Sequence, residues 1–293
     1  MRDRLVLSRR EVFAGCGAAL TLRATTAGGL ARTPVIYDDA GGLLVEASIN
    51  DMSVKRLVLD TGASRSAIGA RYALEIGLPL SAGDVVEGSA GIVGTQKATV
   101  RIGVAGFRTR ALEVTVYDFG SYDNECVGIL GSDMLAGQGE PFLIDYAKRE
   151  IVWSAPRPKA SIRMDLDNGI PRVNAILNGI ELPFRIDTGA TLSPGNRFFV
   201  NVTQDQASKV GFKGPPAMTF SAGGTGGASL SLPVYSIAEF AISGRTLGPA
   251  LAIVQPKVGY FARPDAVGFL GNSVLDKLNP FLDYKGGFFG LGV

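Results

Sequence analysis

Two aspartates in nearly identical surroundings are the residues of this sequence best suited to chemistry. Asp60 lies in the segment Leu-Asp-Thr-Gly-Ala-Ser (59–64), and Asp187 lies in Ile-Asp-Thr-Gly-Ala-Thr (186–191). Each follows an apolar run that is typical of a strand. If a two-fold arrangement brings the two carboxyl groups together, they cannot both ionise easily and they share a proton. One carboxylate then takes a proton from water while its partner donates one, which is hydrolysis without a covalent enzyme intermediate.

The residues that follow each aspartate have roles in this scheme. Gly62 and Gly189 allow a sharp turn at the end of each strand. The hydroxyl groups of Thr61 and Thr188 can form hydrogen bonds across the axis and fix the geometry of the pair.

The sequence contains no histidine, and this absence excludes several hydrolytic mechanisms. Ser-His-Asp systems, Cys-His systems and His-ligated zinc sites all need an imidazole. We therefore expect catalysis by carboxylates, with no metal and no organic cofactor. The only cysteines are Cys16 and Cys126, and we expect Cys126 to be a buried apolar side chain.

The 293-residue chain carries the same series of motifs twice. Five landmarks between residues 45 and 143 recur in the same order between residues 173 and 282, and the second copy has a longer segment after its aspartate. Such internal repetition indicates two lobes of similar fold. We expect a signal peptide (1–31), a first lobe (32–154), a Pro-containing linker (155–160) and a second lobe (161–293).

The composition and the local patterns favour strands over helices. The chain has 39 glycines, only 19% charged residues and many short Val/Ile/Leu-rich runs. Asn178-Gly179, between two such runs, predicts a hairpin. Helices are expected to be few and short, over residues 66–75, 132–135 and 273–278, the last with Asn272 as N-cap. The predicted fold class is all-β, mainly strands with a few short helices.

The duplicated motif resembles those of retropepsin-type and pepsin-type aspartic peptidases. Their signature is Asp-Thr/Ser-Gly followed later by two apolar residues and Gly, here Ile129-Leu130-Gly131 and Phe269-Leu270-Gly271. The resemblance covers most of residues 42–293 and is greatest to bacterial retropepsin-like proteins with both lobes in one chain. It implies two homologous acid-protease-like lobes with a cleft between them, an extended polypeptide substrate, and a monomer that holds the complete Asp60/Asp187 dyad.

The resemblance also points to flaps over the cleft and to two departures from the pepsin pattern. The Gly-rich segments Ser89–Gly94 and Ser221–Gly227 are the flap candidates. Within them, the residues expected to contact substrate are Ser89, Ala90, Gly91, Ser221, Ala222 and Gly223. Pepsin-like flaps carry a Tyr, which is missing here. Pepsin-like lobes also have Ser or Thr where this chain has Ala63 and Ala190, so we expect a raised dyad pKa and activity above strongly acid pH.

The first 31 residues resemble a bacterial twin-arginine signal. Ser8-Arg9-Arg10 precedes a short apolar run that ends at Leu22, too short to span a bilayer, and Gly29-Leu30-Ala31 offers a cleavage site. Its removal changes the net charge from +2 to −1, because it takes away five Arg and two acidic residues. The sequence thus predicts an exported protein, periplasmic or secreted, with no membrane span in the mature chain and no nucleic-acid partner.

Two other functions remain open from the sequence. An inactive protein of the same fold could bind extended peptides by strand addition. The paired segments 60–64 and 187–191 also fit the phosphate-binding loops of sugar-kinase, actin and chaperone-ATPase folds. Those folds need long helices in each half, so helix content discriminates between the two classes.

Overall fold

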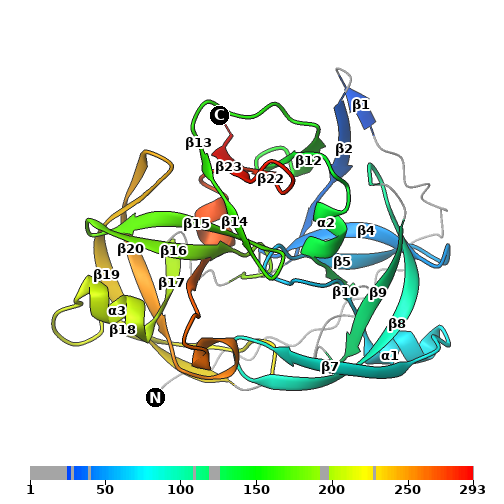
Figure 1. The fold of residues 1–293 in the computed structure, drawn as a ribbon, viewed down its shortest axis with the longest axis horizontal. Helices are drawn as coiled ribbons and strands as arrows, with labels where there is room; N and C mark the ends of the chain where they lie inside the picture. The colour runs from blue at the N-terminus through cyan, green and yellow to red at the C-terminus, as the bar shows by residue number, and fades with distance from the viewer. Residues whose placement is uncertain are drawn as a thin grey trace, which may run out of the picture.

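The computed structural model describes residues 25–27, 30–38, 41–107, 110–118, 126–191, 198–226 and 229–292. Within these ranges the chain is mainly β, with short helices (Figure 1). The longest described helix, α3 (Gln204–Val210), has seven residues. The predicted fold class is confirmed, and the described part of the chain has none of the long helices that a sugar-kinase or actin fold needs.

The first eight-stranded sheet forms the lobe at the right of Figure 1. Its strands, in spatial order, are β3 (Ile36–Tyr37), β4 (Leu43–Ile49), β5 (Lys55–Leu59), β10 (Cys126–Leu130), β6 (Ala67–Gly69), β9 (Arg110–Tyr117), β8 (Ile92–Val104) and β7 (Ser81–Glu87). β8 also pairs with β4, so the sheet folds back on itself. Cys126 is buried, as expected from the sequence.

The second eight-stranded sheet repeats this order strand for strand. Its strands are β14 (Asp165–Asp167), β15 (Ile170–Leu177), β16 (Ile180–Ile186), β21 (Gly268–Leu270), β17 (Phe199–Thr203), β20 (Arg245–Gln255), β19 (Leu230–Ile242) and β18 (Met218–Ala222). β15 and β16 form the predicted hairpin, and Asn178 and Gly179 both have positive φ, at 47° and 79°. The matching order is what a duplicated sequence predicts.

A third sheet of seven strands joins the two halves at the top of Figure 1. Its order is β1 (Thr25–Ala27), β2 (Leu30–Pro34), β12 (Glu150–Trp153), β11 (Phe142–Asp145), β22 (Pro280–Asp283), β23 (Phe288–Leu291) and β13 (Ser161–Arg163). The central pair, β11 and β22, takes one strand from each half. Residues 155–160, the expected linker, connect β12 to β13 without regular structure.

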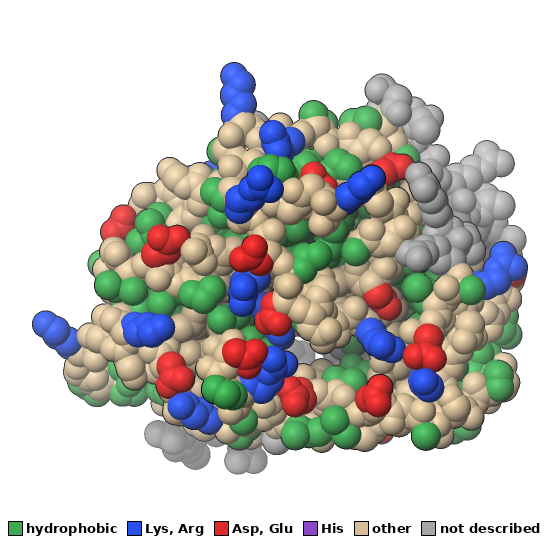
Figure 2. Space-filling view, in the orientation of Figure 1, with side chains coloured by type: hydrophobic (Ala, Val, Ile, Leu, Met, Phe, Trp, Pro, Cys, Tyr) green, Lys and Arg blue, Asp and Glu red, His purple; other side chains and the backbone are tan. Residues whose placement is uncertain are grey.

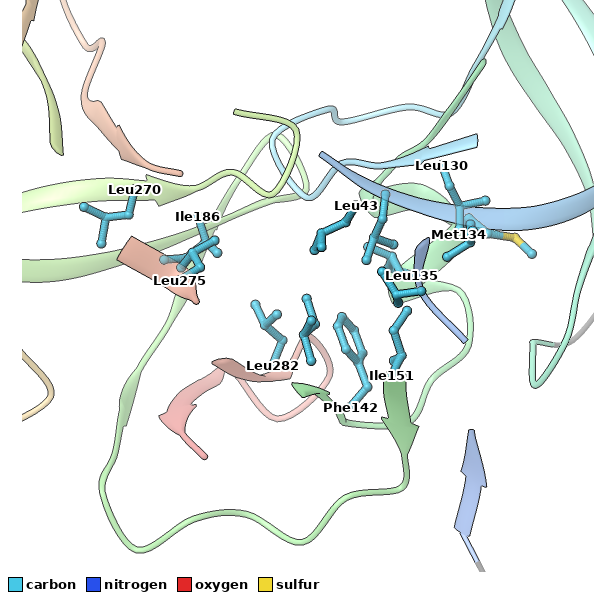
Figure 3. Close-up of a cluster of buried hydrophobic side chains, with 14 of the residues drawn as sticks. Leu43, Leu130, Met134, Leu135, Phe142, Ile151, Ile186, Leu270, Leu275 and Leu282 are labelled. Carbon is cyan, nitrogen blue, oxygen red and sulfur yellow. The ribbon is translucent and has the colours of Figure 1, made fainter. Parts of the chain in front are cut away.

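The core is continuous through all three sheets. Figure 3 shows a cluster in which Leu130 and Met134 come from the first lobe, Ile186 and Leu270 from the second, and Phe142 from the joining sheet. All five side chains have no exposed surface. Burying one such side chain stabilises a fold by about 1.5–3 kcal/mol. Because the cluster spans both lobes, it fixes the lobes against each other.

The helices differ in part from those that the sequence predicts. The expected helix 66–75 begins at Ala70 (α1, Ala70–Glu75), because residues 67–69 form β6 between β10 and β9. The expected helix 273–278 is α4 (Asn272–Leu275), and its N-cap is Gly271, not Asn272.

The remaining helical segments lie after strand ends. α2 (Ser132–Ala136) lies close to the expected range, and a 3-10 turn, η1, spans Gly259–Ala262. α3 was not expected, although Thr203 and Gln206 form a capping box that marks its start.

The predicted signal peptide falls largely outside the described residues. The described part begins at Thr25, and β2 pairs Arg32, Thr33 and Pro34 with β12. These three pairs lie after Ala31, but β1 and the first two residues of β2, Leu30 and Ala31, belong to the same sheet and precede the expected cleavage site, which remains a prediction. None of the described helices is both long and apolar enough to cross a membrane.

Candidate active site

Asp60 and Asp187 occupy equivalent turns at the ends of β5 and β16. In each turn the aspartate N–H donates to a strand-end carbonyl of the neighbouring parallel strand, Leu130 for Asp60 and Leu270 for Asp187, both at 3.0 Å. The two apolar-apolar-Gly segments predicted to accompany the aspartates therefore lie directly beside them. The structure gives the two turns the same surroundings, one from each lobe.

Thr61 and Thr188 connect the two turns through four hydrogen bonds. The Thr61 hydroxyl donates to the Ile186 carbonyl (2.7 Å) and accepts from the Thr188 N–H (3.1 Å). The Thr188 hydroxyl does the same in reverse, donating to the Leu59 carbonyl (2.7 Å) and accepting from the Thr61 N–H (3.0 Å). Neither threonine has exposed surface. The predicted bonds across the axis are thus present, and they hold the two turns in register.

The turns bring the carboxyl groups of Asp60 and Asp187 together. The two side chains form a hydrogen bond with each other. Each carboxyl also accepts from its own turn: Asp60 Oδ1 from the N–H of Gly62 (2.8 Å) and Ala63 (3.0 Å), and Asp187 Oδ1 from the N–H of Ala190 (3.0 Å). These backbone donors stabilise the ionised form.

Burial and mutual repulsion dominate the ionisation of the pair. Burial raises the pKa of Asp60 above its ordinary value, against the lowering effect of its backbone donors. Burial, and then the neighbouring charge of Asp60, raise the pKa of Asp187 well above its ordinary value. The pair therefore holds one proton over a range of pH in which an isolated aspartate is ionised.

A cavity of about 530 Å³ opens above the pair, between the two lobes. Its lining residues include Asp60, Asp187, Ile129, Phe269, Tyr117 and Phe261. Figure 2 shows the surface hollowed between the lobes, with charged side chains of both signs on the rims.

The hairpin tip of the first lobe covers the cavity. Ser89, Ala90 and Gly91 lie in the turn between β7 and β8, and Ser89 lines the cavity. The Ala90 N–H donates to the Thr225 carbonyl of the second lobe (3.1 Å), so the two hairpin tips meet. The Gly88 carbonyl accepts from the Tyr260 N–H in η1 (3.0 Å), which fastens this tip to the second lobe again.

The second hairpin is not arranged as the sequence match predicts. Ser221 and Ala222 end β18, and Gly223 begins the turn, whereas their counterparts in the first lobe lie within the turn itself. From this turn it is Thr225 that lines the cavity, and Gly227, the end of the expected flap, lies outside the described residues. The Ser-Ala-Gly match therefore aligns a strand end with a hairpin tip, because the second turn is longer.

A charged and aromatic cluster in the second lobe escaped the sequence reasoning. Arg185, two residues before Asp187, makes two hydrogen bonds to Asp167 Oδ2 (2.7 and 3.0 Å), and its guanidinium lies 3.8 Å from the Tyr260 ring centre. Tyr260 lies in the longer second middle segment, which was the only signal for it. These groups give the cavity unequal walls despite its symmetric floor.

Comparison with known proteins relates part of this chain to aspartyl proteases. Residues 45–134 match the aspartyl protease family model. The match covers β4 to α2 and includes Asp60 but not Asp187. No curated protein matches the chain. Among solved structures, this chain is similar to a retropepsin-like aspartic protease from Rickettsia conorii. The match covers 44% of this chain and 87% of the Rickettsia chain, with 18% sequence identity and a TM-score of 0.31.

Proposed function

We propose that this protein is an aspartic endopeptidase with Asp60 and Asp187 as its catalytic residues. The observation that carries the proposal is the pair of equivalent turns, which place two hydrogen-bonded carboxyl groups at the floor of a cavity. The family match of the first lobe supports the same class of activity. Both lobes lie in one chain, so a monomer contains the complete pair.

The pair performs hydrolysis with a single shared proton. The ionised carboxylate removes a proton from a water molecule, and the water oxygen attacks the peptide carbonyl carbon. At the same time the protonated carboxyl donates its proton to the carbonyl oxygen. The carboxyl that took the proton from water then gives it to the amide nitrogen, the other carboxylate takes a proton from a hydroxyl of the tetrahedral intermediate, and the C–N bond breaks. The backbone donors of Gly62 and Ala63 keep the ionised form of Asp60 accessible.

The substrate in this proposal is an extended polypeptide. A chain lying in the cavity passes between the carboxyl pair and the tip at Ser89, where backbone groups of the hairpin can pair with its own. The tips are closed by the Ala90–Thr225 and Tyr260–Gly88 bonds, so entry requires these to open.

Incubation of the full chain with a pool of unstructured peptides from pH 3 to 8 tests the proposal. Mass spectrometry of the products is expected to reveal internal cleavage that the Asp60→Asn and Asp187→Asn variants lack. Peptide binding without cleavage by the folded parent at every pH would favour the inactive peptide-binding alternative and would overturn the proposed activity.

The raised pKa values predict activity above the strongly acid range. Activity needs one ionised and one protonated carboxyl, so it appears as pH rises through the lower pKa of the pair and is lost through the upper one. The acid and the alkaline limb of the pH–activity profile both move to higher pH, because the pKa values of both carboxyl groups are raised. The measurement is kcat/KM against pH, and a maximum below about pH 3 would contradict it.

A matched variant tests the cause of that profile. Ala63→Ser introduces a hydroxyl next to Asp60 that can donate to its carboxylate, and we expect the acid limb to move to lower pH. An unchanged or raised acid limb in a folded Ala63→Ser variant would contradict the assignment of the profile to this pair.

We also propose that the protein is exported through its twin-arginine signal. The Arg9-Arg10 pair and the short apolar run that follows support this localisation. Cell fractionation of the parent and of an Arg9→Lys/Arg10→Lys variant tests it, with the variant expected to remain in the cytoplasm. Equal export of both would overturn the proposal.

A further inference from the structure

The residues that follow Gly131 and Gly271 each donate a side-chain hydrogen bond to an aspartate turn. The Ser132 hydroxyl donates to the Thr61 carbonyl (2.9 Å), and the Asn272 side-chain N–H donates to the Thr188 carbonyl (2.7 Å). Ser132 and Asn272 occupy equivalent positions in the two lobes, and both are buried. Each turn therefore receives one side-chain donor at the carbonyl of its threonine.

Behind each of these donors lies a tyrosine from the opposite half of the chain. Tyr284, after β22, makes a 2.9 Å hydrogen bond with the Ser132 hydroxyl, and Tyr146, after β11, donates to the Asn272 side-chain oxygen at 2.6 Å. The crossing follows from the joining sheet, in which β11 pairs with β22 between the lobes.

The direction of the proton donors is fixed along each series of bonds. Ser132 has one hydroxyl proton, which it gives to the Thr61 carbonyl, so Tyr284 is the donor toward Ser132. Tyr146 likewise donates to Asn272, whose amide donates onward. Burial raises the pKa of both tyrosines well above its ordinary value, so both hydroxyls keep their protons.

The last bond of each series reaches a carboxyl of the pair. The Thr61 carbonyl and the Gly62 N–H belong to one planar peptide unit, and the Gly62 N–H donates to Asp60 Oδ1 at 2.8 Å. The Thr188 carbonyl and the Gly189 N–H form the equivalent peptide unit. The Gly189 N–H lowers the pKa of both carboxyl groups. A donor at the carbonyl orients and polarises the unit, which strengthens the N–H bond on its other side.

We propose that Tyr146 and Tyr284 are positioning residues for the carboxyl pair, each holding the aspartate turn of the opposite lobe through Asn272 or Ser132. The inference rests on the proposed function. The buried hydrogen bonds from tyrosine hydroxyl to threonine carbonyl carry it, because they occur twice with the same order of groups. Closure of the joining sheet thereby becomes a condition for an aligned pair.

Removal of a tyrosine hydroxyl is expected to weaken catalysis without weakening substrate binding. In Tyr284→Phe and Tyr146→Phe, the peptide unit loses polarisation and its N–H stabilises the ionised carboxylate less, so the acid limb moves to higher pH. We expect kcat to fall about threefold to tenfold, the effect of one hydrogen bond, with KM unchanged. The titratable groups that act electrostatically on Tyr284 are Asp60, a member of the pair, and Asp133; those that act on Tyr146 are Tyr37 and Asp276. All four remain in Tyr284→Phe and Tyr146→Phe.

Tyr37→Phe is the matched control. Its hydroxyl donates to the Tyr146 backbone carbonyl (3.0 Å) and to neither Ser132 nor Asn272. It is expected to lower the thermal midpoint as the other two variants do, while leaving kcat and the pH profile unchanged. Loss of stability alone in all three variants would overturn the proposal. Where Tyr284→Phe does not fold, Ser132→Ala breaks the same series and is expected to give the same kinetic change.

Titration of the aspartate carboxyl carbons by NMR separates this inference from the proposed function. The midpoint of the Asp60/Asp187 pair is measured in the parent, Tyr284→Phe and Tyr37→Phe, with no substrate present. A higher midpoint in Tyr284→Phe, with the parental midpoint in Tyr37→Phe, supports the positioning role even if the parent cleaves no peptide. Identical midpoints in all three proteins would overturn the inference, whatever the parent's activity.

Discussion

Asp60→Asn and Asp187→Asn are each expected to reduce kcat for peptide cleavage by about 10²- to 10⁴-fold, the contribution of general acid–base catalysis. Both carboxyl groups act in the same step, one as base and one as acid, so either substitution removes the shared proton or its acceptor. An Asn side chain keeps an oxygen that can accept from the Gly62 and Ala63 N–H groups, so the turn retains its bonds.

The same substitutions are expected to raise stability at neutral pH. A carboxyl whose pKa is raised in the folded state contributes stability below its ordinary pKa of 3.8, and this contribution is lost as pH rises through the folded value. Asp187, whose pKa is raised well above 3.8, therefore disfavours the folded state at pH 7, and the neutral Asn does not. Thermal midpoints at pH 7 and pH 3 measure this, with the advantage of Asp187→Asn confined to pH 7.

Asp165→Asn is the control for both measurements. Asp165 makes a surface ion pair with Arg172 (3.6 Å) and its side chain is 77% exposed, so its loss is expected to change neither activity nor stability appreciably. An inactive but stabilised Asp187→Asn protein cannot be explained by misfolding. Full activity in either Asn variant would show that the two carboxyl groups do not act as a pair.

The duplication is what made the floor of the site predictable. Two Asp-Thr-Gly turns at matching places require matching strands, and the strand order of the second lobe repeats that of the first. The hydroxyls of Thr61 and Thr188 could be assigned across the axis because a two-fold axis places equivalent atoms opposite each other. Symmetry supplied the long-range information that local patterns lack.

Where the two copies differ, the sequence was a weaker guide. The second hairpin turn is longer than the first, so Ser221–Gly223 was placed at a tip although Ser221 and Ala222 end a strand. Tyr260 reaches the cavity from a segment with no counterpart of equal length. The sequence repeats an Asp-Tyr pair, at Asp145-Tyr146 and Asp283-Tyr284. The crossing of these tyrosines to the opposite lobe depends on the pairing of β11 with β22 and leaves no local pattern.

Gly62→Ala and Gly189→Ala are expected to abolish most of the activity while leaving both aspartates in place. A Cβ atom at Gly62 would lie 2.4 Å from Asp187 Cγ, and one at Gly189 would lie 2.4 Å from Asp60 Cγ. Each methyl group thus meets the carboxyl of the opposite lobe, which has to move. Since misplacement of a catalytic group by about 1 Å costs about 10²-fold in rate, we expect at least that loss in kcat.

Gly94→Ala tests whether the loss comes from that contact. The structure places Gly94, the end of the expected flap, in β8 and not among the residues that line the cavity. A Cβ atom there would meet no other atom within 4 Å, so its substitution is expected to leave activity unchanged. Overpacking at Gly62 is expected to cost about 1–3 kcal/mol of stability, measured by denaturant unfolding. A folded Gly62→Ala protein with parental kcat would mean that the carboxyl pair is farther apart than the turns place it.

Combining Gly62→Ala with Asp187→Asn distinguishes displacement of the pair from an independent defect. If the methyl group acts only by moving the Asp187 carboxyl, the double variant is expected to be no slower than Asp187→Asn alone, because groups that act as a unit are not additive. An additive loss would place the effect of Gly62 elsewhere, for example on its own N–H bond to Asp60. The comparison therefore measures whether the carboxyl groups of the two lobes work as one unit, which is the physical claim that a duplicated site makes.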